Sequence, residues 1–458
     1  MYPIIALSIS GLLTLFLGFL DNKKLVFPIS ILFLVIALGV SFIDWNAPGL
    51  YFSEMLAVDN ETIIFGAVML ISAILILCLS EGFNDFEFSQ PAEYFALVQL
   101  SLIGALMMVS FENLIMLFLG IEILSIGLYV LTGADKRNLR GNEAAIKYFL
   151  MGAFATGILL FGIAMFYGAV GSFNIHVSVI DEAYLPFFWI GCTLILVGLT
   201  FKISAAPFHF WSPDVYEGAP TIFTAYMATV VKTAGFVAIF KVLYSSFSAI
   251  TEFWTPMIVI MVGASLIIGN VFAVTQDSFK RLMAYSSVSH AGFMLLALVG
   301  DNEGAFGTIM FYSVAYSLAT ITAFGVLMKV SKHRIEKGRP YEKIDLFEGL
   351  FKNNGFLAGV LAIAMLSLAG IPLTAGFWGK FFVFSDAASS GNFTLIVIAV
   401  FMSAVAVYYY FKPIILSMKK SDGVETVVLS PLVKLIFVLT TCGTIILGIF
   451  PNLLRSIF

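Results

Sequence analysis

Charged residues are scarce in this chain of 458 residues. Asp, Glu, Lys and Arg together make up 11% of the sequence, whereas soluble domains carry about 25%. Hydrophobic residues make up 60%, and the mean hydropathy is +1.01. A soluble chain of this length would need a polar surface that these residues cannot supply. The composition therefore predicts an integral membrane protein, and the small net charge of −4 excludes bulk attraction to nucleic acid.

Cysteine is also rare. Cys78, Cys192 and Cys442 are far apart, lie in apolar segments and form no CxxC or iron–sulfur spacing. We interpret them as thiols packed in the core. The sequence has no glycine-rich phosphate loop, nucleophile elbow or metal-ligand spacing. The first twenty residues lack the basic region of a secretory signal, so we expect them to remain as the first spanning helix.

Long apolar runs recur along the whole chain, and about 20 residues suffice for a helix to cross a bilayer. The sequence therefore predicts an all-α integral membrane fold with about 14 transmembrane helices and short connections. We place them near residues 3–20, 25–43, 61–80, 94–111, 113–132, 144–170, 186–209, 221–245, 255–275, 281–300, 305–329, 355–385, 393–417 and 431–450.

Lysine and arginine are concentrated in alternate loops between these spans. The basic loops carry Lys23 and Lys24; Lys136, Arg137 and Arg140; Lys280 and Arg281; Lys332, Arg334, Lys337, Arg339 and Lys343; and Lys412, Lys419 and Lys420. The intervening loops carry Glu54, Asp59, Asp181, Glu182, Glu252, Asp301, Glu303 and Asp386. Because basic loops stay in the cytoplasm, we expect both termini outside.

Two segments combine a proline with small residues inside an apolar run. They read AAPFHFW at 205–211 and AGIPLTAGFW at 369–378, with Pro207 and Pro372 at the predicted breaks. A repeat of five spans would insert its second copy upside down, and interrupted helices in inverted repeats mark transport paths. We therefore divide the chain into a three-helix segment at 1–92, a first repeat at 93–245, a second repeat at 255–417 and a last helix at 431–458.

A few ionisable residues remain at membrane depth. A lone ammonium there costs roughly 2.5–3.5 kcal/mol. Glu122 lies near the middle of its span, and Lys202 lies beside the first break. Each has a structural interpretation. Glu122 would be a protonated carboxyl that forms hydrogen bonds, and Lys202 would bind the backbone carbonyls that the break frees. The functional interpretation is a proton path, because burial disfavours an ammonium while a nearby carboxylate favours it.

Lys232 belongs to a stripe of small or polar residues at helical spacing, with Thr221, Ala225, Ala228 and Gly235. Such a stripe faces protein or water, so we expect Lys232 inside the protein and not snorkelling to an interface. Lys380 lies eight residues after Pro372, where an exit-side role and snorkelling are both open.

Lys147 and the histidines leave more than one interpretation open. Lys147 follows Glu143 by four residues, which is the spacing of an ordinary ion pair. His290 lies in the polar run YSSVSH and is either a packing residue or a proton relay, and His209 in the first break is similar. His176 and His333 lie in loops and receive no role.

Several stretches resemble a known family. They are FLGIEILSIGLYVLTG, NEAAIKYFLMGAFATGILLFG, FKISAAPFHFWSPDVYEGAPT, VVKTAGF, FKRLMAYSSVSHAGF and GIPLTAGFWGKFFVF. In order and content they resemble subunit N of bacterial NADH–quinone oxidoreductase (respiratory complex I), a family of antiporter-like membrane subunits. The resemblance implies fourteen helices in two inverted five-helix bundles, with the seventh and twelfth helices broken.

The resemblance also assigns roles. It implies that Glu122, Lys202, Lys232 and Lys380 are the proton-translocating glutamate and lysines, and Lys147 and His290 match motif positions. The implied chain lies in the bacterial inner membrane among other membrane subunits and binds no cofactor itself. NADH and quinone are used by the whole complex. The alternatives are a subunit of a multi-subunit cation/proton antiporter and a structural membrane subunit whose charges only specify packing.

Overall fold

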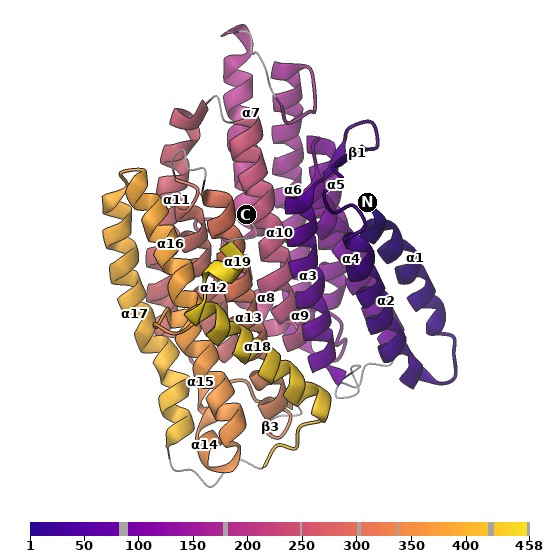
Figure 1. The fold of residues 1–458 in the computed structure, drawn as a ribbon, viewed down its shortest axis with the longest axis vertical. Coiled ribbons are helices and arrows are strands. Elements are labelled where there is room, and N and C mark those ends of the chain that lie inside the picture. Colours follow the sequence, from indigo (N-terminus) through magenta and orange to yellow (C-terminus); the bar gives the residue numbers. More distant parts are fainter. Residues whose placement is uncertain are drawn as a thin grey trace.

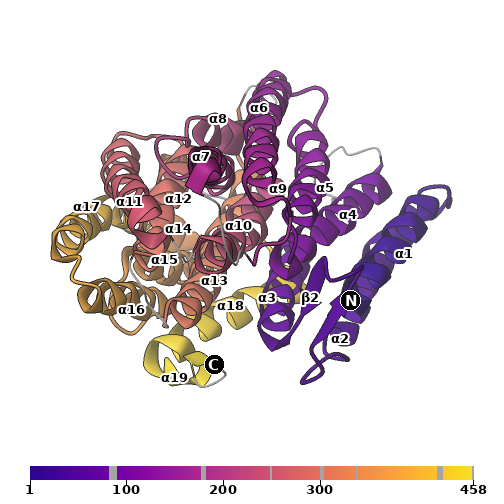
Figure 2. The same cartoon turned by 90° about the horizontal axis from the view of Figure 1, so that it is seen from above.

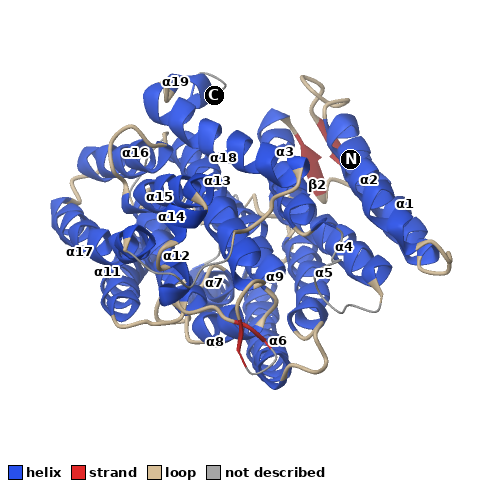
Figure 3. Ribbon diagram, turned by 90° about the horizontal axis from the view of Figure 1, so that it is seen from below, coloured by secondary structure: helices blue, strands red, loops and turns tan. Residues whose placement is uncertain are grey.

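The computed structural model describes residues 1–81, 90–176, 182–247, 250–299, 304–336, 339–419 and 426–455. Within these ranges the regular structure is overwhelmingly helical, which confirms the predicted all-α class. Two small antiparallel ladders pair β1 (Gly49–Tyr51) with β2 (Leu56–Val58) and β3 (Ile335–Glu336) with β4 (Arg339–Pro340). Figure 3 shows how little of the molecule these strands occupy.

The first part of the chain contains ten α-helices among its described residues. They are α1 (Tyr2–Leu17), α2 (Val26–Ser41), α3 (Asn60–Leu79), α4 (Pro91–Ser110), α5 (Leu114–Thr132), α6 (Leu139–Val170), α7 (Leu185–Lys202), α8 (Trp211–Gly218), α9 (Thr221–Tyr226) and α10 (Lys232–Lys241). Two π-helical turns, η4 (Met227–Val231) and η5 (Val242–Ser246), make 221–246 one continuous helix.

The described residues of the second part form nine more. They are α11 (Thr251–Val274), α12 (Phe279–Leu296), α13 (Ala305–Ser331), α14 (Leu350–Asn353), α15 (Gly355–Ala369), α16 (Ala375–Ser389), α17 (Phe393–Met418), α18 (Pro431–Ile449) and α19 (Asn452–Arg455). Short 3-10 turns are η1 (Lys23–Leu25), η3 (Glu182–Tyr184) and η7 (Ile344–Phe347).

The helices coincide with the apolar runs. Every range predicted as a span contains one of these helices or a pair separated by a break. In the described ranges, eleven helices are long and apolar enough to cross a membrane, and α1 and α15 are shorter apolar helices. A helix satisfies its own backbone hydrogen bonds, as a lipid environment demands. The chain is therefore a multi-pass membrane protein. The count of fourteen transmembrane helices, the division into four segments and the inverted repeat stay predictions.

Local sequence signals set several helix ends. Asp59 accepts a hydrogen bond from the Thr62 amide while the Thr62 hydroxyl accepts one from the Asp59 amide, a capping box that begins α3. Pro91 and Pro431 begin α4 and α18, where the missing N–H costs nothing. Gly171 ends α6 with a left-handed φ of 73°.

The two halves of the bundle meet at α13. Figures 1 and 2 show α1 and α2 at one side of the molecule and α16 and α17 at the other, with α10 and α13 between them. α13 packs against α9, η4 and α10 of the first half and against α15 and α16 of the second. α18 then crosses α3, α13 and α16. The continuous helix 221–246 is therefore enclosed by protein.

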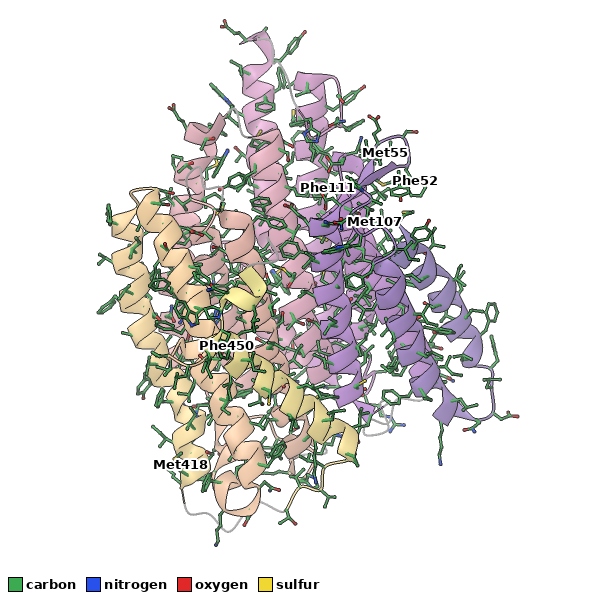
Figure 4. All side chains as sticks on the ribbon, in the orientation of Figure 1. Phe52, Met55, Met107, Phe111, Met418 and Phe450 are labelled. Carbon is green, nitrogen blue, oxygen red and sulfur yellow. The ribbon has the colours of Figure 1, made fainter. Side chains whose placement is uncertain are left out.

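Apolar side chains cover the outer faces of the bundle (Figure 4). Exposed examples on α6 and α17 include Phe154, Phe401 and Met418, which is labelled in that view. A membrane supplies the partner that such side chains lack in water. Cys78 and Cys192 are buried as expected, but Cys442 is exposed. The packed-core interpretation is wrong for Cys442, because its side of α18 faces away from the bundle.

Both proline-containing segments are interrupted. After α7 the chain passes through residues 203–210, with Ser204 at a φ of 58° and a cis peptide before Pro207. The Trp211 side chain donates to the Phe201 carbonyl at 3.1 Å, and the Ala206 amide donates to Ser265 Oγ of α11 at 2.8 Å. These bonds satisfy backbone groups that the break frees.

The second break is shorter. α15 ends at Ala369, Gly370 and Leu373 adopt positive φ angles of 84° and 72°, and α16 begins at Ala375. A side chain at Gly370 would be strained by its left-handed backbone and would also meet the Lys380 side chain.

Some loop residues used in the orientation argument lie outside the described ranges: Asp181, Asp301, Glu303, Lys337 and Lys420.

Candidate functional site

Lys202 is the last residue of α7 and is buried beside the first break. Its ammonium donates to Ser125 Oγ of α5 at 2.7 Å and lies 5.8 Å from the centre of the Tyr148 ring. Tyr148 in turn stacks on Trp211, the first residue of α8. The structure therefore holds Lys202 with a hydroxyl and an aromatic face, and not with the carbonyls of the break.

Glu122 lies on α5, one turn before Ser125. Its side chain is half-buried. Among the described residues no ion pair joins Glu122 to Lys202; the hydroxyl of Ser125 occupies that hydrogen-bonding position. On α5 the residue that Lys202 contacts is thus Ser125, one helical turn from Glu122.

Lys232 begins α10 directly after the η4 turn, and its side chain is 3% exposed, so it does not snorkel. It donates to both the carbonyl and the hydroxyl of Ser287 on α12, and its ammonium lies 5.6 Å from the Tyr316 ring. The predicted stripe is wrong in detail, because the extra residue of a π turn rotates Lys232 and Gly235 relative to Thr221. Residues 221–239 are buried on all sides, so no single face is distinguished.

His290 lies on α12, one turn after Ser287. Its Nδ1 is 2.7 Å from the Tyr312 hydroxyl of α13, and its Nε2 is 3.0 Å from the Tyr410 hydroxyl of α17. Its ring packs 4.8 Å from the Tyr316 ring. The same Tyr316 ring therefore lies against both Lys232 and His290.

Lys380 lies on α16 just after the second break and is buried, so snorkelling is wrong for it as well. Its ammonium donates to the Ala369 carbonyl at 2.8 Å and to Ser403 Oγ of α17 at 3.0 Å. It also lies 4.8 Å from the Phe293 ring of α12. The role considered for Lys202, binding a carbonyl freed by a broken helix, is performed here by Lys380.

Lys147 takes part in a network near the ends of α6, α8 and α12. It pairs with Glu143 at 2.7 Å, as the spacing predicts, and with Asp214 of α8 at 2.7 Å. Arg281 pairs with Asp214 and with Glu217. Burial alone would raise the pKa of Asp214, but hydrogen bonds from Lys147 and Arg281 outweigh it and lower that pKa. Lys147 is thus part of a partly exposed ionic network, apart from the buried lysines.

Other buried or partly buried lysines have carboxylate partners. Lys280 of α12 pairs with Glu342 at 2.7 Å and donates to the Ala219 carbonyl at 2.8 Å. Further pairs join Lys241 to Glu112 and Lys329 to Glu81. By contrast, the described partners of Lys202, Lys232 and Lys380 are hydroxyl and carbonyl oxygens. These six described lysines therefore fall into two chemical groups.

The other histidines have different surroundings from His290. His209 is buried in the first break, and its Nδ1 has no hydrogen-bond partner among the described atoms. His176 is exposed and pairs with Glu112 at 2.8 Å. No group of three or more metal-binding side chains occurs within the described residues.

Several side chains around the lysines escaped sequence reasoning. Ser125 could have been found, because it lies one helical turn from Glu122 on the same face. Tyr312, Tyr410 and Ser403 could not, since they reach His290 and Lys380 from helices far along the chain.

Residues 112–406 match the protein family described as NADH:quinone oxidoreductase/Mrp antiporter, TM. Relatives named NADH-quinone oxidoreductase subunit N occur in Cytophaga hutchinsonii, 38% identical over 100% of this chain and 99% of the relative, and in Flavobacterium psychrophilum, 38% identical over the full length of both. A chain of respiratory complex I from Thermus thermophilus is 33% identical, with a TM-score of 0.87 over 99% of this chain and 98% of that one.

A chain of the Mrp complex from Dietzia sp. DQ12-45-1b shares the fold, with a TM-score of 0.85 over 99% of this chain and 95% of that one. Its identity is 18%, so this likeness concerns the fold alone.

Proposed function

The chain belongs to the NADH:quinone oxidoreductase/Mrp antiporter transmembrane family, and from this membership we propose that it is the N-type subunit of a proton-pumping NADH:quinone oxidoreductase. It moves protons from the cytoplasm to the outside while other subunits carry electrons. NADH and quinone are used by the whole complex, and the neighbours of this chain are other antiporter-like and small membrane subunits.

The difference between the two groups of lysines carries this proposal. A buried ammonium that pairs with a carboxylate is held in its charged form, because removing the proton would leave a buried carboxylate alone. An ammonium whose hydrogen-bond partners are only hydroxyl and carbonyl oxygens has no carboxylate in contact with it, so its charged and neutral forms are closer in free energy. Lys202, Lys232 and Lys380 are of this second kind and can therefore take up and release protons.

The residues follow one another through the interior. Lys202 lies at the first break, Lys232 lies on the enclosed helix 221–246, His290 lies across Tyr316 from Lys232, and Lys380 lies at the second break. We propose that protons travel in this order. Glu122 modulates the charge of Lys202, and Lys147 holds α8 in place through Asp214 near the cytoplasmic entrance.

Copurification tests the proposal directly. A tagged copy of this chain, expressed from its own locus and extracted in mild detergent, is expected to bring down the peripheral NADH-oxidising subunits together with its membrane neighbours. Membrane vesicles should then show NADH-driven proton uptake that is lost when the chain is deleted. Recovery of cation/proton antiporter subunits without any NADH-oxidising partner would instead identify the chain as part of an antiporter.

The orientation is a second test. We propose that the chain lies in the bacterial inner membrane with both ends outside, from the alternation of basic loops. A periplasm-dependent reporter fused after residue 458 is expected to be active. Activity of a cytoplasm-dependent reporter at that position would contradict the count of fourteen spans.

A further inference from the structure

His290 lies where three helices meet beside the second break. Both of its ring nitrogens are within hydrogen-bond distance of phenol hydroxyls, Nδ1 of Tyr312 and Nε2 of Tyr410. All three side chains are buried: Tyr410 is 1% exposed, Tyr312 3% and His290 4%. His290 is thus placed in series between two hydroxyls.

The Tyr410 side of the series leads toward Lys232. The Tyr410 hydroxyl also shares a hydrogen bond with Ser286 Oγ of α12. Ser286 directly precedes Ser287, whose carbonyl and hydroxyl accept the hydrogen bonds of Lys232.

The Tyr312 side leads toward Lys380. Tyr312 lines a small cavity with room for about one water molecule. Ser367 of α15 and Gly379 of α16, the helices on either side of the second break, also line that cavity. A side chain at Gly379 would meet the Tyr312 ring at 3.1 Å, and Gly379 directly precedes Lys380.

Hydrogen-bond chemistry makes this series directional. A neutral imidazole has one N–H donor and one acceptor nitrogen, whereas a phenol can donate and accept at once. Both nitrogens are therefore satisfied only when one tyrosine donates to the ring and the other accepts from it. Such a chain of donors and acceptors is polarised, which strengthens each bond and gives a proton a continuous path.

We propose that Tyr410 and Tyr312 are proton-relay residues that work with His290 to connect Lys232 to Lys380. The proposal rests on the proposed function, since it concerns the path within a proton-pumping subunit. It adds two groups to the site, and it gives His290 a role that requires both of its nitrogens.

The transfer conserves every proton. A proton arrives at the Tyr410 oxygen from the Ser286 side, and the original Tyr410 proton passes to Nε2 of His290. Nδ1 releases its proton to the Tyr312 oxygen, and the original Tyr312 proton passes to a water molecule in the cavity, which hands a proton on toward Lys380. One proton has entered and one has left, both tyrosines are neutral again, and the imidazole has exchanged tautomers. The hydroxyls and the ring must return to their first arrangement before the next proton.

Tyr409 offers a matched control. It neighbours Tyr410 on α17, is equally buried and lies against the Tyr410 ring at 4.4 Å, but its hydroxyl donates to Asn270 Oδ1 at 2.9 Å and has no hydrogen bond to His290 among the described residues. Tyr409→Phe removes the same atom as Tyr410→Phe from the same helix at the same depth. A general penalty for losing a buried hydroxyl should therefore affect both variants alike.

The experiment compares Tyr410→Phe, Tyr312→Phe, the double variant and Tyr409→Phe in the assembled complex, with Lys232→Ala in the same series. NADH-driven proton uptake by vesicles is normalised to assembled complex and measured in H2O and D2O. The relay variants are expected to lose at least about a hundredfold in proton uptake, the lower end of the range for a positioned proton-transfer group. The double variant should be no worse than the poorer single variant, because the two groups act in series.

The isotope comparison separates relay from packing. Removing a relay hydroxyl makes proton transfer limiting, so the ratio of rates in H2O and D2O should rise above that of the wild type and of Tyr409→Phe. 3-Fluorotyrosine at 410 or 312 keeps shape and assembly, and it is expected to change the rate because it changes the acidity of the phenol. These fluorotyrosine proteins answer the question even where a phenylalanine variant fails to assemble.

Two results would overturn the relay. One is that both phenylalanine variants pump like Tyr409→Phe while Lys232→Ala is inactive, in which case the proposed function stands. The other is that fluorotyrosine leaves rate and isotope ratio unchanged. If Lys232→Ala itself pumps like wild type, the proposed function has failed and the relay falls with it.

Discussion

Replacing Lys232 by alanine is expected to abolish proton uptake almost completely while the complex still assembles. The side chain is buried, and its described hydrogen bonds go to Ser287 rather than to a carboxylate. Its removal therefore leaves no unpaired charge. It leaves a small cavity and two acceptors without their donor, the Ser287 carbonyl and the Ser287 hydroxyl. We expect a loss of at least about a hundredfold in proton uptake, the scale of a lost proton-transfer group. The same result is expected for Lys202→Ala.

Two control variants test the physical reason. Lys280→Ala removes a lysine of equal burial that pairs with Glu342, so it strands a carboxylate and should impair assembly itself. Lys412→Ala removes a partly exposed lysine near Asp277 and should leave both assembly and pumping close to wild type. Proton uptake per assembled complex, with assembly followed by native electrophoresis, provides the comparison. A Lys232→Ala variant that assembles as poorly as Lys280→Ala would favour a structural role for Lys232.

Glu122→Gln is expected to impair pumping although it preserves shape and hydrogen bonding. Lys202 is buried, and its hydrogen-bond partner Ser125 lies one helical turn from Glu122. We therefore expect burial to disfavour the ammonium form of Lys202 and the Glu122 carboxylate to favour it. Without that charge, burial acts alone, so Lys202 stays neutral and stops cycling. Glu122→Asp keeps the charge at a shorter reach and should retain more activity than Glu122→Gln.

Coupling between the two residues is tested by combination. The double variant Glu122→Gln with Lys202→Ala should cost little more than either single change, because the two residues act as a unit. Ser125→Ala is a useful companion, since Ser125 is the hydrogen-bond partner of Lys202 but carries no charge. Its effect should be smaller than that of Glu122→Gln. NADH-linked proton uptake that is the same in Glu122→Gln as in wild type would return Glu122 to a structural role.

The helices could be read from the sequence because hydropathy is a local property. A run of about 20 apolar residues has few alternatives to a membrane helix, so every predicted range contains one. The two breaks were visible for a similar reason, since a proline among small residues, at Pro207 and at Gly370–Pro372, disfavours a continuous helix. Burial of Lys232 also followed from its position, half a span from either end.

What the sequence could not supply was the choice of partners. Tyr410 reaches His290 across 120 positions of chain, and Lys147 meets Asp214 across 67. These contacts depend on how helices cross, which hydropathy does not encode. The η4 turn could not be predicted for another reason. Prediction from the sequence assumes 3.6 residues per turn throughout, and the additional residue of a π turn changes the direction in which every later side chain points. Cys442 shows the same limit, because an apolar residue faces lipid or protein equally well.

The contacts between α8 and α12 have a consequence for how this protein can vary. Carboxylates of α8 bind Arg281, the Ala219 carbonyl accepts from Lys280, and the Ala206 amide donates to Ser265 of α11. The broken segment of the first half is thus fastened to helices of the second. The two halves are therefore not interchangeable modules. A chimaera that took residues 93–245 from a relative would bring a foreign α8 against this α12, so the stretch that must be inherited as one piece extends to Arg281.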